Sequence, residues 1–124
     1  MHPLKDLSCL VVEDEALIAL NLCDIIEDLG GRVAARVGRL EKGVELARTE
    51  AIDLAFLDIN LGGPRSFPIA DILRKRGIPF VFVTGYGAEA VEQGYDAPLV
   101  LKPYDEMTIA AGAERALAVT AHRS

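Results

Sequence analysis

Four short apolar segments of this sequence each end in a residue whose side chain could take part in chemistry. Glu13 and Asp14 follow the first segment, and Asp58, Thr84 and Lys102 are the last residues of the other three. If the segments are parallel strands of one sheet, their carboxyl ends meet at one edge. Each residue alone has an ordinary structural explanation, such as a helix cap or a solvated side chain. Together they indicate a site that holds carboxylates, a hydroxyl and an ammonium group.

The chemistry that suits this set is metal-assisted phosphoryl transfer. Carboxylates at short range repel one another unless a cation lies between them, and ligands that are all oxygen suit Mg²⁺, or Mn²⁺ in its place. A carboxylate beside such an ion can attack phosphorus and become an aspartyl phosphate. We therefore predict Asp58 as the phosphoacceptor, with Glu13 and Asp14 as metal-site acids. Lys102 and Thr84 are predicted to contact the phosphoryl oxygens.

Short apolar runs alternate with longer amphipathic segments along the whole chain. The runs expected to form strands are 7–12, 32–37, 53–58, 79–84 and 98–102. The segments expected to form helices are 16–29, 40–51, 67–76, 88–93 and 106–121. Strands that are apolar throughout and separated by helices predict an α/β fold, with a doubly wound five-stranded parallel sheet of the (βα)5 flavodoxin-like kind.

The composition is that of one ordinary domain with an acidic surface. The chain has 124 residues, 51% of them hydrophobic, and a formal net charge of −6. That charge argues against binding to nucleic acid or to an anionic membrane. No apolar run is long enough for a membrane span and no secretory signal is present, so we expect a cytoplasmic protein. Cys9 and Cys23 lie in apolar stretches and are expected to be buried, reduced thiols.

The strand-end residues resemble those of the response-regulator receiver family, and the likeness covers nearly the whole chain. The segments that carry it are 11–15, 57–58, 83–85 and 101–103. The resemblance implies a receiver fold in which Asp58 is phosphorylated and Glu13 and Asp14 form the acidic pair. It also implies that the main-chain carbonyl of Asn60 completes the metal shell, and that the bond between Lys102 and the proline after it is cis.

The resemblance also implies a role in signalling. Receivers of this family take a phosphoryl group from a sensor histidine kinase and act on another protein. We expect residues 1–124 to be a single receiver domain with no output domain. Its partners would be a histidine kinase and an unknown downstream protein, and it could be an activator or a phosphate sink. It would not be an enzyme beyond catalysing its own phosphorylation and dephosphorylation, and its oligomeric state stays open.

One segment is similar to that of a narrower subgroup of stand-alone receivers, which carries the signature Phe-Ala-Thr-Gly-hydrophobic-Tyr. The matching segment here is 79–87, in which Val83 replaces the alanine and Gly87 stands where the tyrosine would be. Members of that subgroup lack output domains and often work with histidine kinases of a distinct class.

Two features differ from typical receivers. Leu99 stands where receivers usually carry a Tyr or Phe that rotates on activation, and Tyr86 and Tyr104 are the candidates for taking over that role. The interval between Thr84 and Lys102 is also short and rich in glycine. We therefore expect a fourth helix that is short or irregular, with low local stability.

Three other classes of protein match parts of the pattern. A haloacid-dehalogenase-type phosphatase would need a second aspartate where Asn60 stands, so its general acid is missing. A flavodoxin-like cofactor binder would need a phosphate loop where the acidic segment 13–15 would repel a phosphate. The remaining alternative is a degenerate receiver, which acts as an unphosphorylated interaction module. Because every functional position is filled, the sequence favours a phosphorylated receiver over this alternative.

Overall fold

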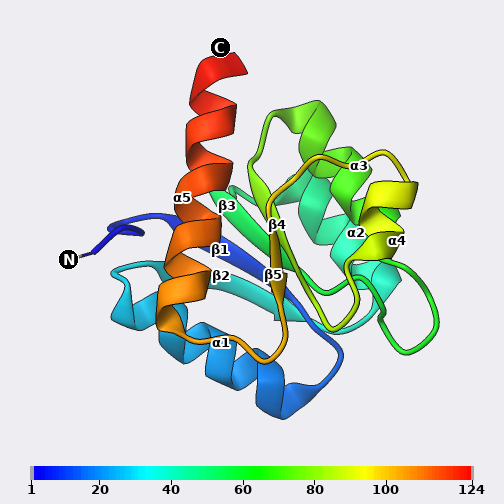
Figure 1. Cartoon of the computed structure of the whole chain (residues 1–124), viewed down its shortest axis with the longest axis horizontal. Coiled ribbons are helices and arrows are strands. Elements are labelled where there is room, and N and C mark those ends of the chain that lie inside the picture. Colours follow the sequence, from blue (N-terminus) through cyan, green and yellow to red (C-terminus); the bar gives the residue numbers. More distant parts are fainter. Residues whose placement is uncertain (1, 124) are drawn as a thin grey trace.

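The apolar runs of the sequence form five strands of a single parallel sheet in the computed structural model, which describes residues 2–123 (Figure 1). The strands are β1 (Ser8–Val12), β2 (Arg32–Val37), β3 (Leu54–Leu57), β4 (Phe80–Thr84) and β5 (Leu99–Leu101). Their order across the sheet is β2-β1-β3-β4-β5, and every pair is parallel. The predicted doubly wound α/β fold is confirmed.

Five helices connect the strands. They are α1 (Ala16–Asp28), α2 (Leu40–Thr49), α3 (Phe67–Arg76), α4 (Ala88–Glu92) and α5 (Glu106–Arg123). Helix α3 ends where predicted, because Gly77 adopts the left-handed conformation (φ 72°) that closes a helix. Helix α4 has only five residues, so the expectation of a short fourth helix is confirmed.

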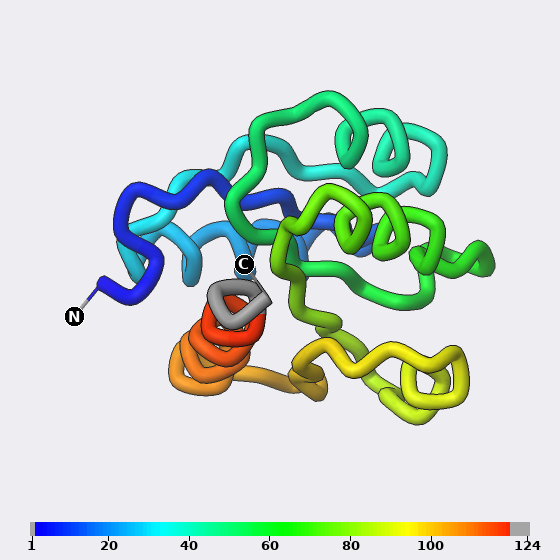
Figure 2. Tube along the Cα trace, turned by 90° about the horizontal axis from the view of Figure 1, so that it is seen from above, coloured from blue at the N-terminus to red at the C-terminus, as the bar shows by residue number. Residues whose placement is uncertain are grey.

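The sheet separates two apolar layers. One layer packs between the sheet and α2 and α3, and its largest members include Leu57, Ile69 and Phe82. The other packs between the sheet and α1 and α5, and contains Phe56 and Ile109. Figure 2 shows α2 and α3 on one side of the molecule and α5 on the other. Apolar side chains are buried on both faces of the inner strands, which is why those strands are apolar throughout.

The order of the strands decides where polar residues gather. From β1 the chain goes to β2 on one side and then returns to β3 on the other, so the connections after β1 and β3 diverge. In folds of this kind, ligands bind at the carboxyl ends of the strands at such a point. The Asp58 N–H donates a hydrogen bond of 2.8 Å to the Val12 carbonyl, which aligns the two strand ends.

The chain leaves β5 through a cis peptide bond between Lys102 and Pro103, as the resemblance implied. The Lys102 N–H donates to the Thr84 carbonyl at 2.9 Å, which extends the pairing of β4 and β5 by one residue.

Within residues 2–123, none of the helices combines the length and the apolar character that crossing a lipid bilayer requires.

Candidate functional site

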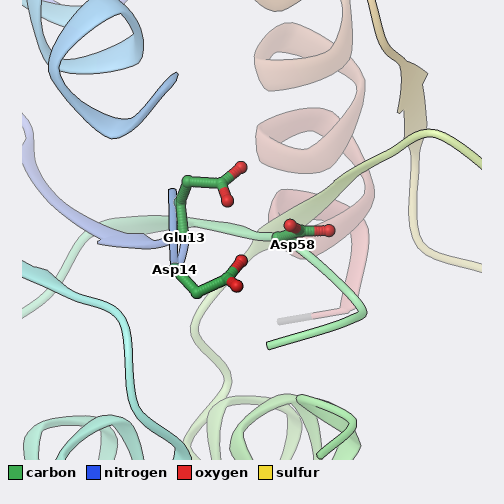
Figure 3. Close-up of side chains that lie close together, drawn as sticks. All are labelled: Glu13, Asp14 and Asp58. Atoms are coloured by element: carbon green, nitrogen blue, oxygen red, sulfur yellow. The ribbon is translucent and has the colours of Figure 1, made fainter. Parts of the chain in front are cut away.

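Three carboxylates meet between the ends of β1 and β3. Glu13 and Asp14 follow β1 and Asp58 follows β3, and one oxygen from each lies within 4.8 Å of the others. Figure 3 shows the three side chains close together at these strand ends. Glu13 and Asp58 are buried (5% and 7% exposed), whereas Asp14 is open to solvent. The site therefore combines two buried acids with one that faces solvent.

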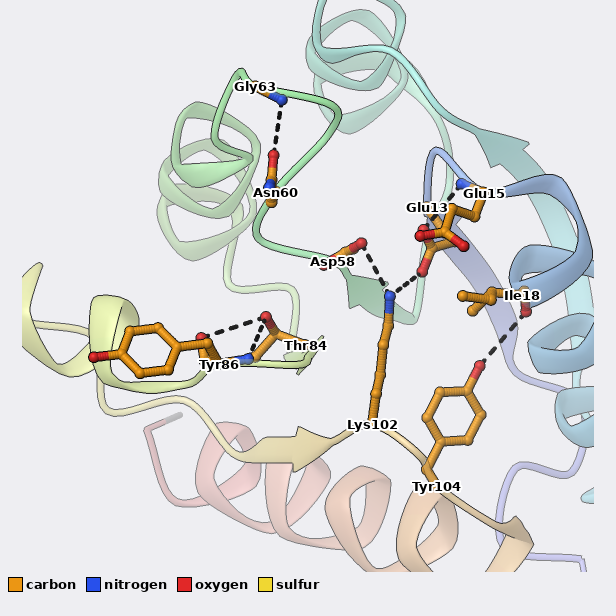
Figure 4. Close-up of polar contacts among 10 residues, drawn as sticks. All are labelled: Glu13, Glu15, Ile18, Asp58, Asn60, Gly63, Thr84, Tyr86, Lys102 and Tyr104. Carbon is orange, nitrogen blue, oxygen red and sulfur yellow. Dashed lines mark hydrogen bonds and ion pairs between the residues drawn. The ribbon is translucent and has the colours of Figure 1, made fainter.

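Lys102 lies between two of these acids. Its Nζ donates to Glu13 Oε1 at 2.7 Å and to Asp58 Oδ2 at 3.1 Å (Figure 4). Burial alone would lower the pKa of Lys102, but the hydrogen bonds to Glu13 and Asp58 outweigh it and hold the pKa above its ordinary value. The ammonium group therefore stays charged and offsets part of the repulsion between the carboxylates.

The oxygens of the two buried acids are not equally engaged. Glu13 uses both, because its Oε2 accepts a hydrogen bond of 3.0 Å from the Glu15 N–H. Asp58 uses Oδ2 for Lys102, and its Oδ1 makes no hydrogen bond within the described part of the chain. The Asp58 carboxylate is thus held in place through one oxygen, and the other has no hydrogen-bond partner among the described residues.

Asp14 is the exposed member of the cluster, and its surroundings shift its pKa. Burial, followed by the hydrogen bond with Glu13, raises the pKa of Asp14. Gly62 (φ 75°) lies beside it, and a Cβ at Gly62 would come within 3.3 Å of Asp14 Oδ2. The glycine therefore leaves the space beside this carboxylate open. A crowded set of oxygen ligands with open space beside it fits a hard divalent cation.

The loop after β3 holds Asn60 rigidly. Its side-chain Oδ1 accepts a hydrogen bond of 2.8 Å from the Gly63 N–H. On either side, the Ile59 carbonyl accepts from the Ser66 N–H at 2.9 Å and the Leu61 N–H donates to the Pro64 carbonyl at 2.8 Å. Because the side chain is committed to the loop, the main-chain carbonyl is the group of Asn60 that could serve a metal. That role remains a prediction.

Thr84 stands at the neighbouring strand end, but its hydroxyl group is engaged elsewhere. It is buried (5% exposed), and its Oγ1 accepts from the Tyr86 N–H at 3.3 Å and donates to the Tyr86 carbonyl at 3.4 Å. Within residues 2–123 no hydrogen bond joins this hydroxyl to Asp58 or Lys102. The structure thus brings Glu13, Asp14, Asp58 and Lys102 together and leaves Thr84 directed at the chain that leads into α4.

Neither tyrosine proposed as a replacement for the switch aromatic contacts Thr84 through its ring. The Tyr86 ring is 68% exposed and points away from the site, and only the backbone of Tyr86 contacts Thr84 (Figure 4). The Tyr104 hydroxyl donates to the Ile18 carbonyl of α1 at 3.5 Å. Leu99 instead packs against Gly87, where a Cβ would lie 2.8 Å from Leu99 Cδ2.

One ion pair near the site was not anticipated from the sequence. Arg65, in the loop after β3, donates from Nε to Glu89 Oε2 at 2.5 Å. Its Nη1 also donates to the Gly63 carbonyl at 2.8 Å. The partners lie 24 residues apart in a glycine-rich loop and a weak helix, so no local pattern connects them.

Comparison with known proteins agrees with this geometry. The model of the response regulator receiver domain matches residues 9–114. The solution structure of SdrG from Sphingomonas melonis Fr1 is 38% identical, with a TM-score of 0.78, and the match covers 95% of this chain and 99% of SdrG.

Two curated relatives are larger. The phyllosphere-induced regulator PhyR of Methylorubrum extorquens is 31% identical over 121 residues, which cover 87% of this chain and 42% of PhyR. The transcriptional regulatory protein PdtaR of Mycobacterium tuberculosis is 31% identical over 102 residues, which cover 77% of this chain and 49% of PdtaR.

The chain spans about half the length of these curated relatives. Fold, strand-end residues and similarity all lead to one conclusion. The chain belongs to the response regulator receiver family.

Proposed function

We propose that this chain is a phosphoacceptor receiver of a two-component phosphorelay, phosphorylated on Asp58 by a sensor histidine kinase. The observation that carries the proposal is the state of the Asp58 carboxylate. One oxygen is held by Lys102 at 3.1 Å, and the other makes no hydrogen bond in the described part of the chain. A nucleophile needs this combination of fixed orientation and a free lone pair.

The acidic cluster suits a metal in this reaction. Glu13, Asp14 and Asp58 would hold Mg²⁺, or Mn²⁺, through carboxylate oxygens, together with the main-chain carbonyl of Asn60. When bound, the ion supplies positive charge that neutralises the carboxylates and the oxygens of an incoming phosphoryl group. A bound cation would favour the ionised form of Asp14, whose pKa is raised first by burial and then by the hydrogen bond with Glu13.

The residues of the chain account for the rest of the transfer. Asp58 Oδ1 forms the new bond to phosphorus while the nitrogen–phosphorus bond of the phosphohistidine breaks, and the electron pair of that bond returns to the ring nitrogen. Lys102 is close enough to neutralise a phosphoryl oxygen as the charge develops. The Thr84 hydroxyl must leave the Tyr86 backbone to reach another oxygen, and this movement would change the chain that leads into α4.

The output would be contact with another protein. Large apolar side chains are exposed around α4 and β5, namely Tyr86 (68%), Val91 (68%) and Leu101 (58%). We propose that the altered position of Thr84 remodels this surface, with residues 1–124 acting as one receiver unit. A PhyR from Bartonella quintana, 25% identical over half its own chain, is named an anti-anti-sigma factor, which agrees with output by protein contact. The same pocket would serve a phosphate sink.

Intact-protein mass spectrometry tests the proposal. The chain is incubated with Mg²⁺ and acetyl phosphate beside Asp58→Asn and a control, Asp28→Asn, which changes an exposed acid remote from β3. We expect one labile phosphoryl group on the wild type and the control and none on Asp58→Asn. If no form gains mass, the experiment is repeated with a phosphorylated histidine kinase. Failure there as well would favour the alternative, an unphosphorylated interaction module.

A further inference from the structure

We propose that Arg65 is a positioning residue that ties the loop beside Asp58 to helix α4 through Glu89. The acidic site and the fourth helix would then be thermodynamically coupled by an ion pair as well as by Thr84. The proposal rests on the proposed function, because the ligand that drives the coupling is the metal or phosphoryl group at Asp58. The contact between Arg65 and Glu89 does not involve Leu99, which stands where receivers usually carry the switch aromatic.

On the loop side, Arg65 is part of a compact hydrogen-bonded unit. Its backbone forms an isolated antiparallel bridge with Asn60, and its Nη1 donates to the Gly63 carbonyl at 2.8 Å. Gly63 in turn donates its N–H to Asn60 Oδ1 at 2.8 Å. The guanidinium group therefore fixes the conformation of the loop that carries the Asn60 carbonyl. A movement of the Asn60 carbonyl toward a metal would therefore also move Gly63, which is hydrogen-bonded to Asn60, and Arg65, which forms the bridge with it.

On the helix side, the same guanidinium group binds α4. Nε donates to Glu89 Oε2 at 2.5 Å, and the two side chains are 42% and 27% exposed. Glu89 lies in the first turn of α4, where the helix dipole favours an acid. The next residue, Ala90, is 1% exposed and anchors the helix to the apolar layer. Arg65 thus reaches α4 at the turn that follows Gly87.

Helix α4 is weak enough for one such contact to matter. A helix of five residues is far below the length at which helices are stable alone, so tertiary contacts decide whether it forms. Its N-cap residue is Gly87, which has no side chain to cap the helix, and Gly94 after the helix has a positive φ of 82°. Loss of the ion pair should therefore loosen α4 as a whole, although a partly exposed pair contributes little to overall stability.

Coupling of this kind is reciprocal. If the ion pair couples the two segments, a ligand that orders the loop from Asn60 to Arg65 also orders α4 through Glu89, and an ordered α4 tightens ligand binding by the same coupling free energy. Glu89 lies outside the acidic cluster of Glu13, Asp14 and Asp58. A substitution at Glu89 that alters metal binding would therefore do so without removing a metal-site acid, and the double variant with Arg65 tests whether the effect passes through the ion pair.

The test combines hydrogen exchange with metal binding. Wild type, Arg65→Gln, Glu89→Gln, the double variant and a control, Glu92→Gln, are compared by hydrogen–deuterium exchange mass spectrometry with and without Mg²⁺. Glu92 is an exposed acid of the same helix and makes no ion pair with the described side chains of residues 2–119. The Mg²⁺ dissociation constant of each form is measured by calorimetry. Circular dichroism checks that each variant is folded.

We expect both single variants to exchange faster than wild type in 60–66 and in 86–94, already without Mg²⁺, while Glu92→Gln matches wild type. The Mg²⁺ dissociation constant should rise about two- to fivefold in each single variant and no further in the double variant. The coupling is refuted if Glu89→Gln loosens only 86–94 and binds Mg²⁺ like wild type. If wild type binds no Mg²⁺, the proposed function fails. Unchanged exchange of residues 60–66 in both single variants would by itself refute the link between the loop and α4.

Discussion

Lys102 Nζ lies 2.7 Å from Glu13 Oε1 and 3.1 Å from Asp58 Oδ2, so one ammonium group joins two carboxylates that follow different strands. Both carboxylates are buried, and the lysine side chain is only 20% exposed. Without a metal, this ammonium group is the cation that holds the two buried acids together.

Lys102→Met should therefore destabilise the metal-free protein. It leaves Glu13 and Asp58 buried without their cation, and we expect the free energy of unfolding in EDTA to fall by about 1–3 kcal/mol. Mg²⁺ should stabilise the variant more than the wild type, because it replaces the missing charge. Urea denaturation with and without Mg²⁺ measures both effects, with Lys5→Met as an exposed control. Equal stability of variant and wild type in EDTA would contradict this account.

The Thr84 hydroxyl group should speed the transfer of a phosphoryl group to Asp58. Thr84→Ala removes a hydrogen-bond donor worth about 1 kcal/mol, so we expect the rate of Asp58 phosphorylation by acetyl phosphate to fall about fivefold. Thr84→Ser keeps the hydroxyl and should stay close to wild type. The rates are followed by intact mass over time. A Thr84→Ala protein that is phosphorylated at the wild-type rate would show that the hydroxyl serves only the Tyr86 backbone.

Gly87 and Leu99 should be energetically linked. A Cβ at Gly87 would meet Leu99 Cδ2 at 2.8 Å, so Gly87→Ala should lower the free energy of unfolding by about 1 kcal/mol through crowding. In a Leu99→Ala background the space is empty and the same change should cost nothing. Urea denaturation of the two single variants and the double variant gives the coupling energy. An equal cost in both backgrounds would mean that Leu99 is not the cause.

Tyr95 should make stability depend on pH in the alkaline range. Burial and then the hydrogen bond to Asp71 raise the pKa of Tyr95 to about 12 from its ordinary value of 10. The folded state favours the neutral phenol, so its contribution is complete below pH 10 and is lost as the pH rises through about 12.

Tyr95→Phe lacks the ionising hydroxyl group, so its free energy of unfolding should fall less than that of the wild type between pH 10 and about 12. Tyr86→Phe removes the hydroxyl group of an exposed tyrosine and is the control. Denaturation at several pH values, together with the near-ultraviolet absorbance of tyrosinate, provides the measurement. A wild-type protein in which every tyrosine ionises near pH 10 would contradict the assignment.

The two cysteines should differ in reactivity. Cys9 is fully buried in β1, and burial raises its pKa to about 12, whereas Cys23 on α1 is only half-buried. In native protein we expect an aromatic disulfide reagent to modify Cys23 slowly and Cys9 not at all, because the thiolate is the reactive form. Cys23→Ser should abolish native labelling, and unfolding in urea should expose Cys9. Fast labelling of native Cys23→Ser would show that β1 opens readily.

The sheet and the acidic cluster could be predicted because their signals are local. An apolar run followed by an acid or a lysine places that residue at a strand end, and parallel strands bring such ends together. The predicted bounds differ from the structure by a few residues. Asp58 and Lys102, for example, lie just past their strands rather than within them. The expectation of two buried thiols was correct for Cys9 but not for half-buried Cys23.

Contacts between distant residues could not be predicted in the same way. The direction of the Thr84 hydroxyl depends on the turn at Tyr86, and the packing of Leu99 on Gly87 depends on how α4 approaches β5. The partners Arg65 and Glu89 have no pattern in common because each belongs to a segment with weak periodicity. Such contacts are set by the tertiary arrangement, which a strand or helix pattern does not encode.

The division of the core by the sheet has a consequence for how the molecule melts. Neighbouring residues of one strand serve opposite layers: Leu57 packs toward α2 and α3, and Phe56 packs toward α1 and α5. A cavity made in either layer weakens strands that the other layer needs. The two layers are therefore parts of one cooperative unit, and heating should unfold them together in a single transition.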